Sequence, residues 1–367
     1  MFDIAIIGAG PAGATLARLI GNSNKVLLID KKQLTMTPEE DFGHAKCCGG
    51  LLAPDAQEML AVLGLGLPQH VLVGPQLFVV RTIDLQNAIE RYYQRFYINI
   101  DRGKFDRWLL SLLPDSVDVR LGSLCKSFEK SNGSFQLKLF QHGKEYIEHA
   151  KILIGADGAL SMVRRQAFPH HPFPKKYIAV QEWFETERVL PYFTTIFDRE
   201  ITDFYSWTIP KENFLLVGAA LSPQEKTSPK FELLKKKLCE YGFKLGRRVK
   251  KEGAFILRPV SATQIRVGGG GIALLGEAAG WISPSSAEGL SYSFRSALLL
   301  AQSLQKGQEH FLKHYYHKTR RMRKNILLKN AKSPFMYHPW IRKMVMASGI
   351  LSVDVFDILP TDKSGDS

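Results

Sequence analysis

The hydrophobic pattern near the N-terminus predicts a strand, a glycine-rich turn, a helix and a second strand in direct succession. Residues 4–7 form an apolar run rich in isoleucine, which is typical of a buried parallel strand. A glycine-rich turn follows at residues 8–13, and residues 14–20 have the composition of a helix. A second apolar run at residues 26–29 ends at an acid, Asp30. This order of elements is the one in which a glycine loop binds a dinucleotide.

The glycines of this loop have separate roles in such a site. Gly8 permits a tight turn, Gly10 lets the backbone approach a pyrophosphate, and Gly13 lets the helix pack against the strand. The N-terminus of the helix offers free N–H groups and a partial positive charge to phosphates. Asp30 is placed to accept a hydrogen bond from a ribose hydroxyl. The candidate cofactor contacts of this segment are Gly8, Gly10, Pro11, Ala12, Gly13, Asp30 and Lys31.

A second glycine-and-acid turn, far along the chain, indicates which dinucleotide is bound. It is followed by a helix of small residues. FAD is long enough to reach both turns, whereas binding of NAD alone leaves the second turn unexplained. FAD is therefore the expected cofactor. The candidate contacts of this segment are Gly276, Glu277, Ala278, Gly280, Pro284, Glu288, Gly289 and Leu290.

Composition narrows the class of protein only a little. The chain has 367 residues, 45% apolar and 23% charged, which is ordinary for a globular protein with a large core. No apolar run approaches the length of a membrane span, and the first strand begins almost at the N-terminus, so we expect neither a membrane helix nor a leader. The four cysteines, Cys47, Cys48, Cys125 and Cys239, lack metal-ligand spacing and are too few for a disulfide framework. We therefore expect no metal site and a reducing, cytoplasmic location.

The net charge of +14 is concentrated near the C-terminus. Residues 306–343 contain eleven Lys or Arg and one acid, Glu309, and large apolar residues lie between them. This mixture suits docking on an anionic membrane surface. A solvated helix face is an equally good interpretation. No nucleic-acid partner is expected, because no binding motif accompanies the charge.

Two segments resemble flavoproteins built like p-hydroxybenzoate hydroxylase. Residues 155–165 follow an apolar strand and resemble the Asp-Gly motif of that group, which implies that Asp157 and Gly158 contact FAD. Residues 276–289 resemble its third FAD motif. Here Glu277 replaces the usual aspartate and Ala287 replaces a glycine.

Further segments resemble the geranylgeranyl reductases. The run Cys48, Gly49, Gly50 is similar to their Cys-Gly-Gly segment. Residues 205–210 resemble their Tyr-x-Trp-x-Phe-Pro substrate motif, and Arg102 matches another stretch. The resemblance runs from residue 2 to about residue 304 and is closest to the CbrA-like branch of bacterial flavoproteins. It implies that Cys48, Gly49, Gly50 and Arg102 belong to the FAD site.

The resemblance implies an α/β fold with an α+β substrate domain, in which the two domains are interleaved. A Rossmann-like FAD-binding domain comprises residues 1–75, 100–170 and 265–305. A substrate domain built on an antiparallel sheet comprises residues 76–99 and 171–264, and residues 306–367 form a helical basic tail. Short β-rich runs between residues 178 and 220 agree with this division.

The expected chemistry is reduction of a C=C bond in an isoprenoid or other apolar lipid by reduced FAD. Tyr205 and Trp207 lie two apart on a strand and so share one face, where they could line an apolar slot or belong to the sheet core. Cys48 could donate a proton in the reaction or simply fill space beside the cofactor. Tyr205, Trp207 and Cys48 are thus the candidate catalytic residues.

Two other functions remain open at this point. A flavin-dependent monooxygenase, or a halogenase, shares the same FAD motifs, although no lysine in an assignable position supports halogenation. The other is a non-catalytic flavin- and lipid-binding protein. No second glycine fingerprint is present, so the electron donor is expected to bind transiently, as NAD(P)H, ferredoxin, flavodoxin or quinol.

Overall fold

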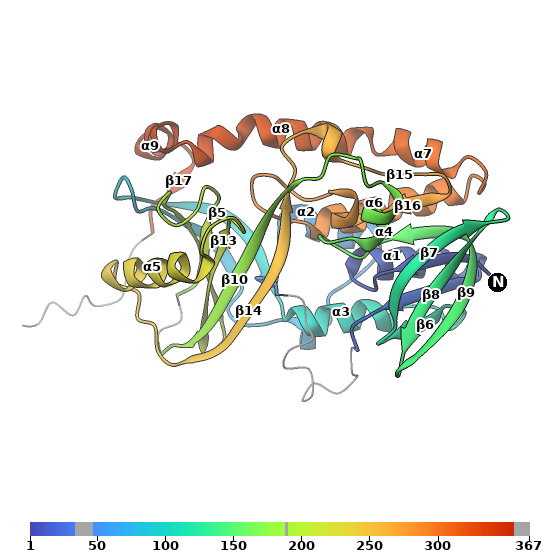
Figure 1. The fold of residues 1–367 in the computed structure, drawn as a ribbon. Helices are drawn as coiled ribbons and strands as arrows, with labels where there is room; N and C mark the ends of the chain where they lie inside the picture. Colours follow the sequence, from blue (N-terminus) through green and yellow to red (C-terminus); the bar gives the residue numbers. More distant parts are fainter. Residues whose placement is uncertain (34–46, 188–189, 356–367) are drawn as a thin grey trace, which may run out of the picture.

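Two large sheets lie side by side in the computed structural model, with helices between and above them (Figure 1). The structure describes residues 1–33, 47–187 and 190–355. In Figure 1 the first sheet lies on the right, near the N-terminus, and the second lies on the left, with α5 on the side away from the first sheet. The predicted fold class, an FAD-binding α/β domain interleaved with a sheet domain, is confirmed by this architecture and by the comparisons given below.

The first sheet is built around the parallel strands that the apolar runs predict. Its order is β15-β16-β9-β1-β2-β6, and β1 pairs in parallel with both β2 and β9. The isoleucines of β1 are buried on both sides of the sheet, as a central parallel strand requires. The strands are β1 (Phe2–Ile7), β2 (Val26–Asp30), β6 (Asp118–Leu121), β7 (Leu124–Ser131), β8 (Ser134–Gln141), β9 (Lys144–Gly155), β15 (Gly268–Gly269) and β16 (Ile272–Leu274).

The second sheet has the order β14-β10-β13-β12-β11-β4-β5-β17, and β3 pairs with β5. Its pairs are antiparallel except that β11 runs parallel to β4, which the sequence did not indicate. Pro210 and Lys211 are the last two residues of β12. The strands are β3 (Leu51–Leu52), β4 (Leu77–Asp84), β5 (Ile89–Asn99), β10 (Lys175–Glu185), β11 (Tyr192–Phe197), β12 (Ser206–Lys211), β13 (Phe214–Leu221), β14 (Arg248–Arg258) and β17 (Ser352–Val353).

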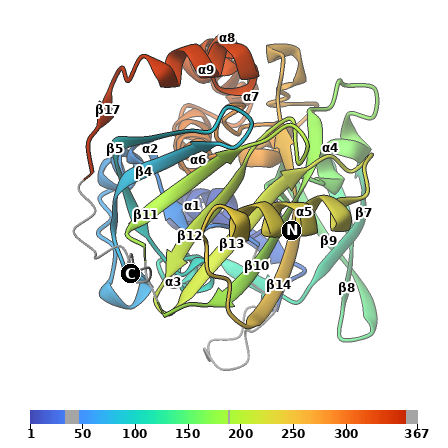
Figure 2. The same ribbon diagram turned by 90° about the vertical axis from the view of Figure 1, so that its left-hand side faces the viewer.

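Helices cover the sheets and fill the space between them. Helix α1 packs against α6 beside the first sheet, while α5 covers the outer face of the second (Figure 2). The α-helices are α1 (Pro11–Ile20), α2 (Pro54–Val62), α3 (Arg102–Ser111), α4 (Met162–Ala167), α5 (Thr227–Glu240), α6 (Leu290–Leu304), α7 (Phe311–Lys318), α8 (Arg320–Tyr337) and α9 (Pro339–Ala347). The 3-10 turns are η1 (Gly21–Ser23), η3 (Gln69–Val71), η4 (Ala262–Gln264) and η5 (Gly276–Ala279).

The C-terminal helices form a continuous layer across the top of both sheets (Figure 1). Phe311, Tyr315 and Ile326 are buried in the same core cluster as β1. The Tyr315 hydroxyl donates a hydrogen bond to the carbonyl of Leu274, 3.1 Å away. After α9 the chain forms β17, which pairs with the edge of β5. The tail was predicted to be helical, and β17 is an exception to that prediction. The tail as far as β17 is thus part of the folded body. Among the described residues, no helix is long and apolar enough to cross a membrane.

Candidate active site

One cavity of about 1670 Å³ lies between the two sheets. Its lining begins at the glycine loop after β1 and extends to residues of α8, α9 and the segment that follows. Cavities that hold one drug-sized ligand measure roughly 300–1,000 Å³. This cavity is therefore large enough for a dinucleotide and a further molecule.

The glycine loop has the geometry that a close phosphate approach requires. A Cβ on Gly8, whose φ is +107°, would lie 2.4 Å from the carbonyl oxygen of Ala156, and one on Gly13 would lie 1.9 Å from the Gly8 oxygen. Gly13 is therefore needed for the loop itself, and Gly8 for the close approach of the loop to the Asp-Gly turn. A Cβ on Gly10, in contrast, meets nothing within 4 Å, because that position faces open cavity. The open space beside Gly10 is where a pyrophosphate would approach the helix N-terminus.

Asp30 is fixed by the loop that precedes it. Its Oδ2 accepts a hydrogen bond from the N–H of Ala9 at 2.8 Å, and its Oδ1 accepts one from Lys32 at 2.9 Å. Carboxylate oxygens have several acceptor positions, so a ribose hydroxyl could still donate to this group. Asp30 and Lys31 both line the cavity.

Asp157 is oriented by the helix that follows it. Its carboxylate accepts hydrogen bonds from the Ser161 hydroxyl at 2.5 Å and from the Met162 N–H at 2.6 Å, at the N-terminus of α4. Burial raises the pKa of Asp157, and these hydrogen bonds oppose that rise. Gly158 has a φ of +76° and faces open cavity. The Asp-Gly turn is therefore held in place by α4 and exposed to the cavity.

The two arginines of α4 point in different directions. Arg164 is buried and donates to the carbonyl oxygens of Ala278, Pro172 and Gln264, so it ties α4 to the third FAD motif. Arg165, in contrast, lines the cavity.

The third FAD motif joins the two domains. Glu277 accepts a hydrogen bond at Oε1 from the N–H of Leu257 on β14, 2.9 Å away, so the longer acid reaches into the second sheet. Glu288 accepts hydrogen bonds from the N–H and hydroxyl of Ser291, at the start of α6, and burial raises its pKa. Ala287, where the related motif has glycine, adopts a left-handed φ of +50°. Alanine seldom adopts this conformation, which explains the glycine of the related motif.

Most of the predicted cofactor contacts face the cavity. Those in its wall are Gly8, Gly10, Pro11, Ala12, Asp30, Lys31, Cys48, Gly49, Gly50, Arg102, Asp157, Gly158, Glu277, Glu288, Gly289 and Leu290. The others, Gly13, Gly276, Ala278, Gly280 and Pro284, are not among its lining residues.

The Cys48-Gly49-Gly50 segment forms part of the cavity wall. The Gly50 N–H donates to the Cys48 sulfur at 3.5 Å. Arg102 lies beside this sulfur and donates from Nε to Asp106 at 2.8 Å. Burial opposes the charge of Arg102, but Asp106 and Cys48 outweigh that effect and raise its pKa. A cation and an N–H group therefore face the Cys48 sulfur.

A lysine that belongs to none of the sequence motifs packs behind this segment. Lys211 is buried at the end of β12, and its Nζ donates to the carbonyl oxygens of Gly50 and Ile100 and to Oδ1 of Asn99, at 3.1, 2.8 and 2.5 Å. Burial lowers the pKa of Lys211 to about 7. The three acceptor oxygens favour the charged amine and so oppose this fall in pKa. In the sequence, the one sign that Lys211 is buried was its position directly after Pro210 in an apolar strand.

Tyr205 and Trp207 lie on one side of the second sheet, in the wall of the cavity. Their rings are 5.3 Å apart at an interplanar angle of 49°. Trp207 lies flat against Gly218 of β13, where a Cβ would come within 2.3 Å of the indole. The Tyr205 hydroxyl donates to the carbonyl of Ser286 at 2.8 Å, and burial raises its pKa. The Tyr-x-Trp pair therefore touches the third FAD motif.

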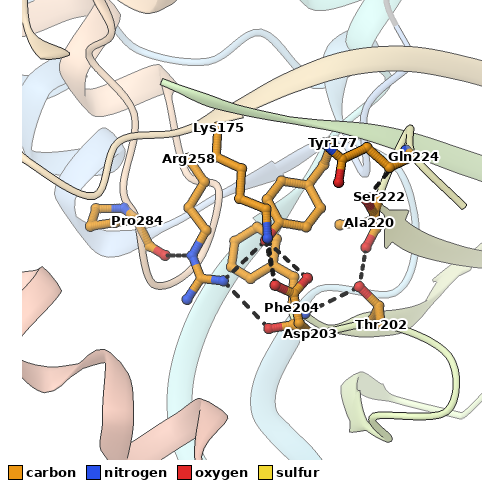
Figure 3. Close-up of polar contacts among 10 residues, drawn as sticks. All are labelled: Lys175, Tyr177, Thr202, Asp203, Phe204, Ala220, Ser222, Gln224, Arg258 and Pro284. Atoms are coloured by element: carbon orange, nitrogen blue, oxygen red, sulfur yellow. Dashed lines mark hydrogen bonds and ion pairs between the residues drawn. The ribbon is translucent and has the colours of Figure 1, made fainter. Parts of the chain in front are cut away.

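Arg258 joins the segment just before Tyr205 to the third FAD motif (Figure 3). Its guanidinium lies 4.4 Å from the ring centres of both Phe204 and Tyr337, and its Nε donates to the carbonyl of Pro284 at 3.0 Å. Its Nη1 reaches the Asp203 carbonyl at 3.4 Å, and the Asp203 carboxylate accepts from Lys175 at 2.6 Å. Figure 3 shows these groups converging around Asp203. The segment before Trp207 is thereby locked to the third motif and the end of α8.

The end of the cavity away from the glycine loop is mostly apolar. Trp207 and Ile209 line it from the sheet, together with aromatic rings of β5 and β11. The C-terminal segment, predicted to be a tail outside the substrate domain, supplies further side chains. These are Phe335, Met336, Tyr337, Val345, Met346, Ile350 and Leu351. Within the described residues, no group of three or more His, Cys, Asp or Glu could hold a metal ion.

Comparison with known proteins shows which solved structures share this fold. No protein-family model matches the chain. Among solved structures, a geranylgeranyl bacteriochlorophyll reductase-like protein of Thermoplasma acidophilum superposes with a TM-score of 0.77, at 20% identity, over 94% of this chain and 87% of its own. PqsL of Pseudomonas aeruginosa, a probable FAD-dependent monooxygenase, gives 0.68 at 16% identity, over 95% and 99%. Halogenase PltM, crystallised with phloroglucinol and FAD, gives 0.69 at 17% identity, over 92% and 78%.

These three structures share the flavoprotein fold described above. The residues around the cavity fit FAD, because an open glycine position, an oriented acid after β2 and the Asp-Gly turn all face one space. FAD, the predicted cofactor, is also what this fold holds in the PltM crystal structure.

A closer relative gives the family. Protein CbrA of Escherichia coli O9:H4 (strain HS) is 41% identical over 360 residues, which is 98% of this chain and 97% of that protein. The chain belongs to the CbrA family. The resemblance to the CbrA-like branch, drawn from the sequence motifs, is thereby confirmed.

Proposed function

We propose that this protein is an FAD-dependent oxidoreductase that reduces a C=C bond in an isoprenoid or other apolar lipid. The observation that carries the proposal is the continuity of one cavity from the open space at Gly10 to the apolar end beside Trp207. A double bond held at that end would lie next to the cofactor site. Apolar walls favour an apolar substrate, since its transfer from water is what drives binding.

FAD, when bound and reduced, supplies a hydride to one carbon of the double bond. The other carbon needs a proton, and Cys48 is the donor that we propose. Its sulfur lies in the cavity wall, and the thiolate left after proton transfer would face the Gly50 N–H and the Arg102 cation. Both groups stabilise a negative charge at that atom. The double bond thus gains two hydrogens, and the flavin is oxidised.

The remaining residues position the substrate. Tyr205 is less suited to proton donation, because its hydroxyl already donates to the Ser286 carbonyl. We assign Tyr205 and Trp207 to the wall that holds the apolar chain. NAD(P)H, ferredoxin, flavodoxin or quinol would return electrons through a transient complex.

A flavin-dependent monooxygenase is the second candidate, since PqsL shares the fold over nearly its whole length. Halogenation has less support. Lys211, next to the Tyr-x-Trp segment, has its amine bonded to Gly50, Ile100 and Asn99 and is not in the cavity wall.

An anaerobic assay separates these candidates. The FAD-loaded protein is reduced chemically, and polyprenyl lipids or oxygen are added in separate trials while the visible flavin band is followed. The proposal predicts reoxidation by the lipid alone, with two hydrogens gained per flavin reoxidised. If the lipid alone leaves the flavin reduced, and oxygen admitted afterwards reoxidises the flavin and places one oxygen atom in the lipid, the protein is instead a monooxygenase.

A further inference from the structure

Helix α8 has apolar side chains on two opposite faces. Met322 and Ile326 are buried in the core below the helix. On the other face, Leu328 is 63% exposed and Phe335 is 55% exposed. These two residues are seven apart, so they lie along one stripe of the helix. Packing in the core explains the apolar side chains on the inner face of α8, but not those on its outer face.

Helix α9 repeats the pattern. Arg342 and Met346 face inward and are buried. Trp340, 66% exposed, and Met344, 56% exposed, lie on the opposite side, one turn apart. An exposed tryptophan beside aliphatic side chains is typical of a surface that meets the membrane interface.

The charged residues around the exposed apolar side chains of α8 and α9 are all basic. Residues 311–347 contain ten Lys or Arg and no Asp or Glu. Lys332 is exposed between Leu328 and Phe335, and Lys343 is exposed beside Met344. We call this surface the docking face and define it by Leu328, Lys332, Phe335, Trp340, Lys343 and Met344.

The cavity reaches the surface next to the docking face. Phe335 lines the cavity although it is 55% exposed, and Ile350 and Leu351, 67% and 85% exposed, line it as well. Side chains that both line a cavity and face solvent mark its opening. Phe335 belongs to both the opening and the docking face.

We propose that the docking face binds an anionic lipid bilayer, so that an apolar chain can pass from the bilayer into the cavity. The exposed apolar side chains would enter the interface, and each nearby Lys or Arg would add about 1 kcal/mol on an anionic surface. A second copy of the chain fits less well, because two such basic faces repel each other. Binding to the bilayer does not depend on the reaction proposed above, whereas entry of the apolar chain rests on it.

Vesicle co-sedimentation tests the inference with the full-length, FAD-loaded protein and no turnover. The vesicles are phosphatidylcholine alone or phosphatidylcholine with phosphatidylglycerol. We expect the protein to pellet with the anionic vesicles and not with the neutral ones, and to be released by high salt. The double variants Trp340→Ser/Met344→Ser and Lys332→Glu/Lys343→Glu should each weaken binding at least tenfold.

Matched controls lie on the first sheet. Ile147→Ser removes an apolar side chain that is 50% exposed, and Lys144→Glu reverses an exposed charge on the same strand; neither should alter binding. Retention of the bound flavin spectrum shows that each variant is folded. Equal pelleting of wild type and both double variants would overturn the inference. So would a dimer in sedimentation velocity that the Trp340→Ser/Met344→Ser variant dissociates, because the face would then be an interface between copies.

Discussion

Arg342 of α9 and Asp84 of β4 form an ion pair, with 2.7 Å between Nε and Oδ2, and their side chains are only 4% and 0% exposed. Arg342 also donates to the carbonyl of Met336 and lies against the ring of Phe197. The pair therefore clamps the C-terminal helices onto the second sheet, where they complete the apolar end of the cavity.

Breaking this pair should destabilise the protein strongly. Removing one partner of a buried ion pair typically costs 3–5 kcal/mol, because the other charge remains buried and unpaired. We expect Asp84→Asn and Arg342→Met each to lower the free energy of unfolding by about that amount in urea titrations, and the double variant to lose less than the sum. Lys126→Met, which breaks the exposed pair with Glu145, should change it little. Additive losses would show that Arg342 and Asp84 do not interact.

The open position at Gly10 predicts a selective loss of FAD. The Cβ of Gly10→Ala meets nothing within 4 Å in the protein, so the fold should be kept while the methyl group occupies the phosphate approach. We expect FAD affinity to fall at least tenfold, measured by fluorescence titration of the apoprotein. Gly66→Ala, also in open space, is the matched control and should bind FAD as wild type does. Unchanged affinity in Gly10→Ala would place the pyrophosphate elsewhere.

Cys48 and Tyr205 should respond differently to removal of their polar atoms. A general acid typically contributes 10²–10⁴-fold to the rate, so Cys48→Ala should slow lipid reduction by roughly that factor. Tyr205→Phe should keep most of the activity, because its hydroxyl is bonded to Ser286. Stopped-flow reoxidation of the reduced flavin measures both, with the exposed Cys239→Ser as control. The assignment of the proton donor fails if Tyr205→Phe is the slower variant.

Lys211 should make the stability depend on pH. Its pKa is about 7 in the folded protein and 10.5 in an ordinary exposed setting. Between these values the unfolded state binds more protons, so the contribution of Lys211 to the free energy of unfolding rises with pH from about 7 towards 10.5. Lys211→Met should lack this rise, whatever its absolute stability. Urea titrations at pH 7 and pH 9 give the change in the free energy of unfolding between the two pH values for wild type and for Lys211→Met. An equal change in both proteins would contradict the lowered pKa of Lys211.

The FAD motifs could be predicted from the sequence because their constraints are local. Gly13 is required by a contact with Gly8 in the same turn, and the acid at Asp30 follows its strand directly. Lys211 and Arg342 could not be predicted in the same way. Their partners Gly50 and Asp84 are 161 and 258 residues away along the chain, so only the folded topology brings them together.

The role of the tail was the main feature that the sequence left open. Its basic and apolar residues favoured a membrane surface and a solvated helix face equally. The pattern along the chain does not say that α8 has an inner face in the core and that Phe335 borders the cavity. That distinction depends on which side of each helix packs against β5 and α6.

The most direct test of the proposed reaction follows one hydrogen atom. The apoprotein is reconstituted with 5-deaza-FAD carrying deuterium at the reduced C5, a position that transfers hydride but does not exchange with water or activate oxygen. Polyprenyl lipid is then added without oxygen and analysed by mass spectrometry. Our account predicts one deuterium at the former double bond of the lipid, with the oxidised deazaflavin formed in equal amount. A lipid that remains unreduced and free of deuterium, while the deazaflavin stays reduced, would contradict the reductase assignment.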